Sequence, residues 1–163
     1  MSSSSSAEAK KARRAQKKIE LVRRINDMMP VPDVCALDLV LSLKSRMLVA
    51  RVSASPLSGD HHSMIRRLLG DLVTTTAVQE HLAVLFEKSD AILAMVESAR
   101  EALVRMTADW KASKAPAGAD LDAVDDCVDI FYDMLRQTKL SEYKTVLQLV
   151  EKELARPRVS QGA

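Results

Sequence analysis

The chain has few aromatic, glycine, proline and cysteine residues, and each shortage narrows the range of folds. Among 163 residues there are four glycines, five prolines and 3% aromatic residues, whereas apolar residues make up 47%. Sheets need frequent turns and favour aromatic and β-branched residues, so this composition favours helices. Because Leu, Val, Ala, Met and Ile must fill the core, helix-on-helix packing is expected. The sequence predicts an all-α bundle of about five to six helices.

Two further absences bear on the location of the protein. No run approaches the ~18–20 apolar residues that cross a bilayer, and no apolar segment typical of a secretory signal follows the N-terminus. Both cysteines, Cys35 and Cys127, fall in apolar helical stretches, so we expect buried free thiols in a reducing compartment. The predicted location is intracellular, cytoplasmic or nuclear. Mitochondrial import is less favoured, because Glu8 and the excess of lysine do not fit a presequence.

Positive charge is concentrated at the N-terminus. Residues 1–24 carry eight basic and two acidic side chains, a net charge of +6, whereas the remainder carries 16 basic and 20 acidic, a net charge of −4. The basic residues are Lys10, Lys11, Arg13, Arg14, Lys17, Lys18, Arg23 and Arg24. Such an arm could contact nucleic-acid phosphates, an anionic membrane or an acidic protein surface, or remain solvated. Residues 1–24 contain no aromatic residue, which argues against base stacking. No apolar face lies beside the basic cluster, which argues against membrane insertion.

Changes in composition divide the chain into four parts. The serine run at the start cannot bury apolar surface, and Pro30 and Pro32 should end the basic helix, because proline lacks an amide hydrogen. The predicted parts are a disordered tail (1–9), a basic helix or arm (10–29), a helical bundle domain (30–156) and a frayed C-terminus (157–163).

One long helix over residues 76–114 is expected at the centre of the bundle. Thr76 and Gln79 match a capping box at its start. Its apolar stripe alternates spacings of four and three: Val78, Leu82, Leu85, Ser89, Ile92, Val96, Ala99, Leu103, Met106 and Trp110. A break at Ser89, its one polar member, is the alternative. The width of the apolar face favours bundle core over a partner-facing or homodimeric seam. Leu103, Met106 and Trp110 are nevertheless candidate partner contacts at its end.

Other helices are predicted on both sides of the long one. A helix from about residue 33 to 54 begins at an Asp33 cap, and its first ten positions are apolar nearly all round, which predicts a place between other helices. Asp60 and Asp120 are expected caps of later helices, the second with Leu121, Val124, Val128, Phe131 and Leu135 inward. A mismatch of phase near Lys139 predicts a kink or turn before the last helix.

Four aspartates could share one face of the helix that follows Asp120. They are Asp122, Asp126, Asp129 and Asp133. Within this segment, residues 125–129 are similar to the DDxxD motif of the all-helical isoprenoid synthases, which implies carboxylates that hold magnesium against a diphosphate. The second metal-binding segment of those enzymes is missing here. Acidic residues also favour the first turns of a helix through its dipole, so no metal or cofactor is predicted.

No catalytic constellation is found elsewhere. His61, His62 and His81 have no Cys or Glu at zinc-like spacing and are expected in loops or on the surface. There is also no glycine-rich phosphate loop and no nucleophile elbow. The order of helices around Leu37 to Leu41, Ile65-Arg66-Arg67 and Trp110-Lys111 resembles the helical N-terminal domain of transcription elongation factors, which implies a peptide-binding module. The Thr-x-Ile-Gly turn usual in that family is missing.

The favoured hypothesis is a non-enzymatic helical adaptor or assembly subunit of a larger complex, which binds partner proteins through its helix faces. In this hypothesis the basic arm contacts an acidic partner surface, and homo-oligomers are also allowed. The alternative is a small nucleic-acid-associated factor, related to transcription or RNA, whose arm binds phosphates.

Overall fold

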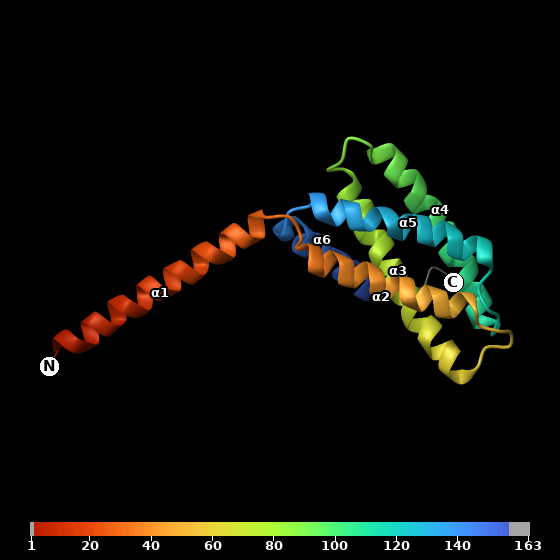
Figure 1. Cartoon of the computed structure of the whole chain (residues 1–163), viewed down its shortest axis with the longest axis horizontal. Coiled ribbons are helices and arrows are strands. Elements are labelled where there is room, and N and C mark those ends of the chain that lie inside the picture. Colours follow the sequence, from red (N-terminus) through yellow and green to blue (C-terminus); the bar gives the residue numbers. More distant parts are fainter. Residues whose placement is uncertain (1, 157–163) are drawn as a thin grey trace, which may run out of the picture.

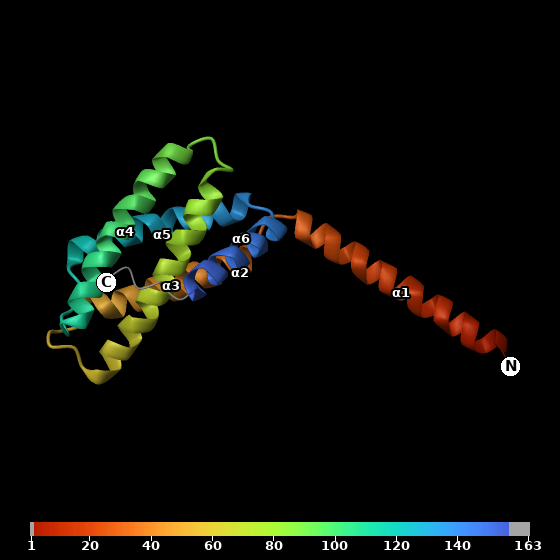
Figure 2. The ribbon, with the colours of Figure 1, turned by 180° about the vertical axis from the view of Figure 1, so that it is seen from behind.

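The computed structural model of the protein describes residues 2–156, with side chains from residue 5 onward. Its six helices are α1 (Ser2–Met28), α2 (Asp33–Arg51), α3 (Gly59–Ala83), α4 (Ser89–Lys111), α5 (Gly118–Gln137) and α6 (Leu140–Ala155). Figures 1 and 2 show α2 to α6 gathered into a bundle, from which α1 projects. The all-α prediction is confirmed, since the described residues form helices and no strand beyond one isolated bridge. Met1 and the predicted frayed C-terminus lie outside the described residues.

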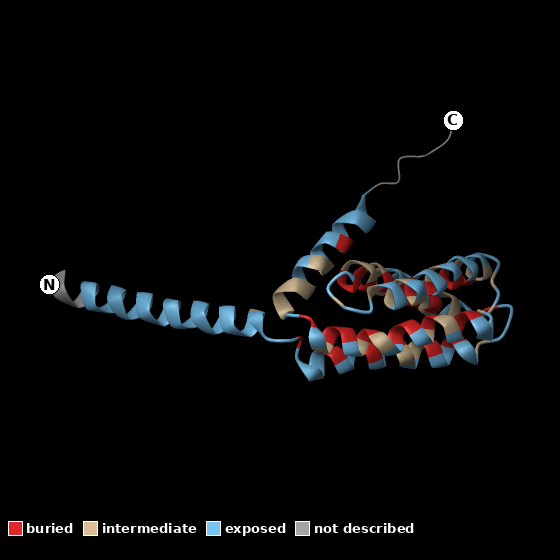
Figure 3. Cartoon of the chain, turned by 90° about the horizontal axis from the view of Figure 1, so that it is seen from above, coloured by how far each residue is buried: buried red, intermediate tan, exposed pale blue. Residues whose placement is uncertain are grey.

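Helix α3 lies at the centre of the bundle, where it packs against α2, α4, α5 and α6. Its side chains Ile65, Leu68, Leu72 and Leu82 are almost fully buried, and each such residue contributes about 1.5–3 kcal/mol relative to exposure. Helix α5 supplies a second buried face, made of the five apolar residues predicted to point inward. Figure 3 shows this buried layer between the helices of the bundle, whereas α1 is exposed from Ser5 to Asn26.

The predicted continuous helix over residues 76–114 is wrong. The structure has two helices there, because α3 ends at Ala83 and α4 begins at Ser89. Figure 1 shows the chain reversing between them. The stripe is nevertheless buried on both sides of the break, at Val78, Leu82 and Val96 among others, whereas Leu85 in the connection is 55% exposed. Both helices bury their part of the stripe in the same core. The spacing of the apolar residues therefore could not distinguish one long helix from two helices that form a hairpin.

The capping box predicted at Thr76 is absent. Thr76 lies inside α3, and its hydroxyl donates to the carbonyl oxygen of Val73 at 3.0 Å. Thr74 and Thr75 likewise bond carbonyl oxygens one turn back, at 3.0 and 2.8 Å. Helix α3 therefore carries its three threonines without a break, since their hydroxyls use intrahelical acceptors.

The three predicted aspartate caps are each displaced into a first turn. Asp33 and Asp120 follow the caps Pro32 and Ala117, and Asp60 follows Ser58, whose hydroxyl accepts from the amide of His61 at 3.2 Å. In the first turn these carboxylates still favour the positive end of the helix dipole. The sequence pattern thus located each helix start within a few residues, but not the capping group.

The ends of the first and last helices are connected across the molecule. Helix α1 stops at Met28, ahead of Pro30 as predicted, although it already begins at Ser2, where a disordered tail of residues 1–9 was expected. The turn predicted near Lys139 is confirmed, because α5 ends at Gln137 and α6 begins at Leu140. These two connections pair in an antiparallel bridge between Pro30 and Lys139.

Candidate interaction surfaces

Helix α1 presents its basic side chains to solvent. All eight predicted basic residues of the arm are exposed, and among the described residues none of them forms an ion pair. A side chain that has no ion partner within its own chain is free to neutralise an external negative charge. Within residues 5–156, an ion pair and hydrogen bonds join this region to the bundle at the C-terminal end of α1, where Asp27 pairs with Lys144.

Helix α1 has two different sides. Lys10, Arg13, Lys17 and Arg24 follow one another at spacings of three, four and seven, and so lie along one side. The other side carries a stripe at the same kind of spacing, namely Ala12, Ala15, Ile19, Val22, Asn26 and Met29. Ile19, Val22 and Met29 are 56–60% exposed. No apolar face was predicted beside the basic cluster, whereas this stripe runs along the same helix, opposite Lys10, Arg13, Lys17 and Arg24.

The base of α1 is held by a small polar cluster. The amide of Val31 donates to the carbonyl oxygen of Thr138 at 3.0 Å, and the amide of Leu140 donates to that of Met29 at 2.9 Å. The guanidinium of Arg136 donates to the carbonyl oxygen of Val31 at 2.6 Å. Val31 is itself buried. The connection between α1 and α2 is therefore fixed to the turn between α5 and α6.

Helix α2 carries an apolar stripe that the bundle leaves uncovered. Its core side consists of Ala36, Val40, Leu43, Met47 and Ala50, all buried. The opposite side carries Val34, Leu37, Leu41, Leu48 and Val52, which are between 43% and 79% exposed. The prediction that α2 sits between other helices is wrong. Apolar residues on all sides could not distinguish a helix surrounded by its own chain from one with a free apolar side.

The three apolar residues proposed as partner contacts lie mostly inside the bundle. Leu103 and Met106 are 4% and 1% exposed, so they form core and are not available to a partner. Trp110 is partly buried, and its ring stacks on that of His62 with centroids 4.5 Å apart. Its indole Nε1 also donates to the carbonyl oxygen of His62 at 2.9 Å. These contacts explain Trp110 as a link between α4 and the start of α3.

The acidic face of α5 is largely occupied by cations from α2. Lys44 Nζ lies 3.3 Å from Asp125 Oδ1 and also contacts Asp129, and the hydrogen bond to Asp129 raises the pKa of the lysine. Arg51 Nη2 lies 2.8 Å from Asp122 Oδ1. Asp126 and Asp133, the other two members of the face, are exposed. Within residues 2–156 no group of three or more His, Cys, Asp or Glu side chains could hold a metal ion.

An apolar hollow lies beside the break between α3 and α4. Its lining includes the apolar residues Phe86, Ile92, Met95, Ile130 and Met134. The charged residues of the lining are Glu87, Lys88, Asp133, Lys139 and Glu142. The residues of the connection were assigned to a helix by the sequence analysis, so this hollow was missed. Sequence carries no sign of it, because it depends on where α3 and α4 separate.

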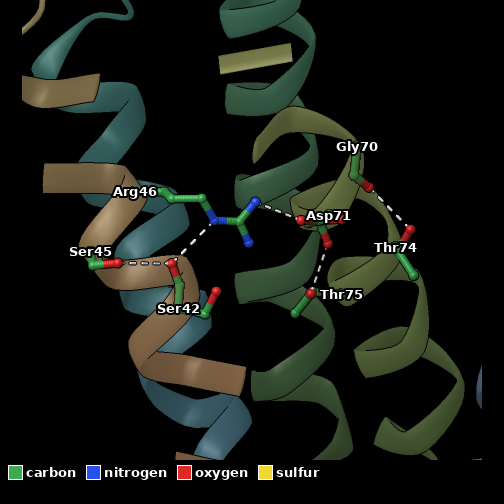
Figure 4. Close-up of polar contacts among 7 residues, drawn as sticks. All are labelled: Ser42, Ser45, Arg46, Gly70, Asp71, Thr74 and Thr75. Atoms are coloured by element: carbon green, nitrogen blue, oxygen red, sulfur yellow. Dashed lines mark hydrogen bonds and ion pairs between the residues drawn. The ribbon is translucent and has the colours of Figure 1, made fainter. Parts of the chain in front are cut away.

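A polar hollow lies between α2 and α3. Figure 4 shows Arg46 of α2 in contact with Asp71 of α3, and their closest atoms are 2.6 Å apart. Arg46 Nε also donates to the carbonyl oxygen of Ser42 at 3.2 Å. The arginine and the aspartate neutralise one another, and so we assign this hollow a structural role in joining α2 to α3.

The histidines and cysteines show a different placement from the predicted one. All three histidines lie on α3 and are half-buried, where loop or surface positions were expected. His81 Nε2 lies 3.3 Å from Glu153 Oε2 of α6. Cys127 is buried as predicted, but Cys35 is exposed. Burial raises the pKa of the Cys127 thiol to about 11.

Among the helices of residues 2–156, none combines the length and apolar character that a bilayer span requires. Three features of the described chain are candidate interaction surfaces: the two sides of α1, the uncovered stripe of α2 and the hollow beside the break between α3 and α4. Comparison of the chain with protein-family models, with curated proteins and with solved structures gives no match.

Proposed function

We propose that the protein is a non-enzymatic helical adaptor or assembly subunit that binds partner proteins through its helix faces, inside the cell. The observation that carries this proposal is α1, a helix of 27 residues whose basic side chains are exposed and without ion partners in the described chain. At 1.5 Å per residue this helix is about 40 Å long, which is long enough to lie along the surface of another protein domain.

The basic side of α1 fits an acidic partner surface. Lys10, Arg13, Lys17 and Arg24 lie on one side, so four charges can face one partner together. Charge complementarity of this kind increases association rates and excludes basic partners. The apolar hollow beside residues 84–88 offers a second surface, on the bundle, lined by apolar and by charged residues. Two such surfaces on one rigid protein would let it connect two chains.

The free thiols support the proposed intracellular location. Cys35 is exposed and Cys127 is buried, and neither forms a disulfide. An exposed free thiol persists more readily in the reducing cytosol or nucleus than outside the cell.

The proposal is tested by reversing the charge on one side of α1. Tagged wild-type protein and the variant Lys10→Glu/Arg13→Glu/Lys17→Glu/Arg24→Glu are expressed in the source cells, and co-purifying proteins are identified by mass spectrometry. A matched control reverses four exposed basic residues of the bundle that line neither surface, Arg66, Lys111, Lys114 and Lys152. We expect a defined set of acidic proteins with the wild type and the control, and its loss with the α1 variant. Identical sets for all three proteins, or no specific partner for any, would contradict the proposal.

A second candidate, a nucleic-acid-associated factor, is favoured by the same unpaired basic side chains. Each phosphate that they neutralise releases counterions, so binding to DNA or RNA must weaken steeply as the salt concentration rises. Fluorescence anisotropy with short duplex DNA, single-stranded DNA and RNA over a salt series tests this. Salt-dependent binding that disappears in the α1 charge variant but not in the bundle control would favour this second function. Absence of binding at low salt would exclude it.

A further inference from the structure

The apolar stripes of α1 and α2 are arranged symmetrically about the connection between the two helices. Counted outward from the junction of Val31 and Pro32, four of the six members of the α1 stripe have a counterpart in the α2 stripe at the same distance along the chain. The matched pairs are Met29 with Val34, Asn26 with Leu37, Val22 with Leu41 and Ala15 with Leu48. Ile19 and Ala12 match Ser45 and Val52 with an offset of one residue. Two stripes with this relation fit each other when the helices run antiparallel.

Within one molecule the two stripes do not meet. Figure 1 shows that α1 leads away from the bundle, so that α1 and α2 form a bent rod and not a hairpin. Closing α1 onto its own α2 would reverse the chain at residues 29–32, where two backbone hydrogen bonds and the Arg136 contact hold the connection open. Both stripes therefore remain exposed in a single copy.

We propose that a second copy of the chain covers both stripes. A two-fold axis that passes beside the junction of Val31 and Pro32 places α1 of each copy antiparallel to α2 of the other. The same matched pairs then form between the copies, twice, while the connection keeps the open conformation of the structure. The relation between the stripes is self-complementary, which is the requirement of a two-fold interface.

Charge favours this arrangement over pairing of α1 with α1. Two copies of α1 side by side would bring together two segments with a net charge of +6 each. Along α2, Lys44, Arg46 and Arg51 are already in ion pairs with α5 or α3. Asp38 of α2 is exposed and, in the matched register, lies within one turn of Arg23 of the other copy. The proposed pairing thus brings an exposed carboxylate to a basic side chain.

The area is sufficient for a dimer. From Ala12 to Met29 the α1 stripe is about 26 Å long, and a helix is about 10 Å wide, so each helix contributes a footprint of about 260 Å². Four helix faces bury about 1,000 Å² in total, which is the lower limit for a specific interface. We therefore expect a reversible dimer whose population depends on protein concentration.

The inference goes beyond the proposed function and does not depend on it. The dimer uses the apolar side of α1, whereas the proposed adaptor binds through the basic side, which stays exposed in the dimer. Failure of the dimer would leave single-copy binding to an acidic partner intact, and failure of partner binding would leave the dimer intact.

The first experiment is sedimentation velocity of the full chain over a range of protein concentrations. We expect the wild type to sediment as a monomer at low and a dimer at high concentration, and Val22→Glu or Leu41→Glu to remain monomeric. Val104→Glu is the matched control, because Val104 is an exposed valine on α4, 71% exposed against 56% for Val22. It should associate as the wild type does. A wild type that stays monomeric throughout, or a control that dissociates equally, overturns the proposal. Circular dichroism checks that each variant stays folded.

The second experiment tests the register. In a Cys35→Ser background, chains carrying Val22→Cys are mixed with differently tagged chains carrying Leu41→Cys and oxidised. We expect disulfide-linked heterodimers of the two tags, and few with Val22→Cys alone or with Val22→Cys against Leu48→Cys, which lies about 10 Å further along the helix. A Val22→Cys/Leu41→Cys double variant that forms the bond within a monomer would show that α1 closes on its own α2 and would overturn the proposal, as would links independent of position.

Discussion

The side chain of Gln79 and residue Cys127 bond each other twice in the core. The amide nitrogen of Gln79 donates to the carbonyl oxygen of Cys127 at 2.8 Å, and the Cys127 thiol donates to the amide oxygen of Gln79 at 3.2 Å. Both side chains are fully buried, one on α3 and the other on α5. Within the described side chains no buried polar atom lacks a hydrogen-bond partner. The two bonds to Cys127 satisfy the amide group of the buried Gln79.

Replacing Gln79 should therefore destabilise the fold strongly. Gln79→Ala removes both hydrogen bonds and leaves a cavity, so we expect a loss of about 2–4 kcal/mol in the free energy of unfolding. Urea denaturation followed by the fluorescence of Trp110, the single tryptophan, measures it. Gln148→Ala, at an exposed position of α6, is the control and should change stability by less than about 0.5 kcal/mol. Equal losses of unfolding free energy for Gln79→Ala and Gln148→Ala would show that the two hydrogen bonds of Gln79 do not stabilise the core.

Leu103 and Met106 should matter for stability and not for association. Because both are buried in the core, Leu103→Ala and Met106→Ala should each cost about 2–5 kcal/mol. Val104→Ala, at the exposed position between them, should cost less than about 0.5 kcal/mol. Thermal unfolding measures these differences. A Leu103→Ala protein that stayed fully stable but lost its partners would show instead that this side chain is a partner contact and not part of the core.

The two cysteines should differ in reactivity toward a thiol reagent. Cys35 is exposed, whereas Cys127 is buried and its pKa is raised to about 11. Since the thiolate is the reactive species, the native protein should show one fast-reacting thiol and a second only after unfolding. Cys35→Ser should abolish the fast reaction. Two equally fast thiols in the native protein would show that α3 and α5 do not enclose Cys127.

Stability should fall in alkaline solution. The unfolded Cys127 thiol ionises near its ordinary pKa of 9.0, whereas burial holds the folded one protonated up to about 11. Above about pH 9 the unfolded state thus binds fewer protons than the folded state. The contribution of the buried thiol to the free energy of unfolding is complete below that pH and is lost as the pH rises through about 11. Burial also raises the pKa of Tyr143, which acts in the same direction. Urea midpoints over this range should decline less steeply in Cys127→Ala than in the wild type; parallel declines would contradict the account.

The ion pairs between α2 and α5 should contribute little to stability. Lys44 and its two aspartate partners are each at least 32% exposed, so Lys44→Ala should cost less than about 1 kcal/mol. Addition of magnesium should not raise the melting temperature of the wild type, because Lys44 and Arg51 already occupy the acidic face. A clear magnesium-dependent increase in the wild type, lost in Asp125→Asn/Asp129→Asn, would instead identify a cation site.

Sequence periodicity predicted what is buried better than how the chain turns. It placed Val78, Leu82 and Val96 on one core face, yet it joined α3 to α4, because Leu85 and Ser89 continue the spacing through the connection. Thr76 looked like a helix start, but the packing of α3 against four other helices keeps the helix intact there. Local pattern describes one face of a helix and carries no information on the number of its neighbours.

The candidate surfaces were predictable to a lesser degree. The basic residues of α1 were found from charge alone, and the structure adds that they share a helix with an apolar side. The uncovered stripe of α2 was missed, because a helix that is apolar all round fits equally a central position and a free face. The distinction depends on which helices the rest of the chain supplies to cover it.

The bridge between Pro30 and Lys139 ties the direction of α1 to the position of the turn between α5 and α6. Because α1 is about 40 Å long, a change of angle at this bridge would displace the far end of the helix much more than the bridge itself. A binding event that moved this turn would thus change where the basic side chains are held, without any contact to α1 itself.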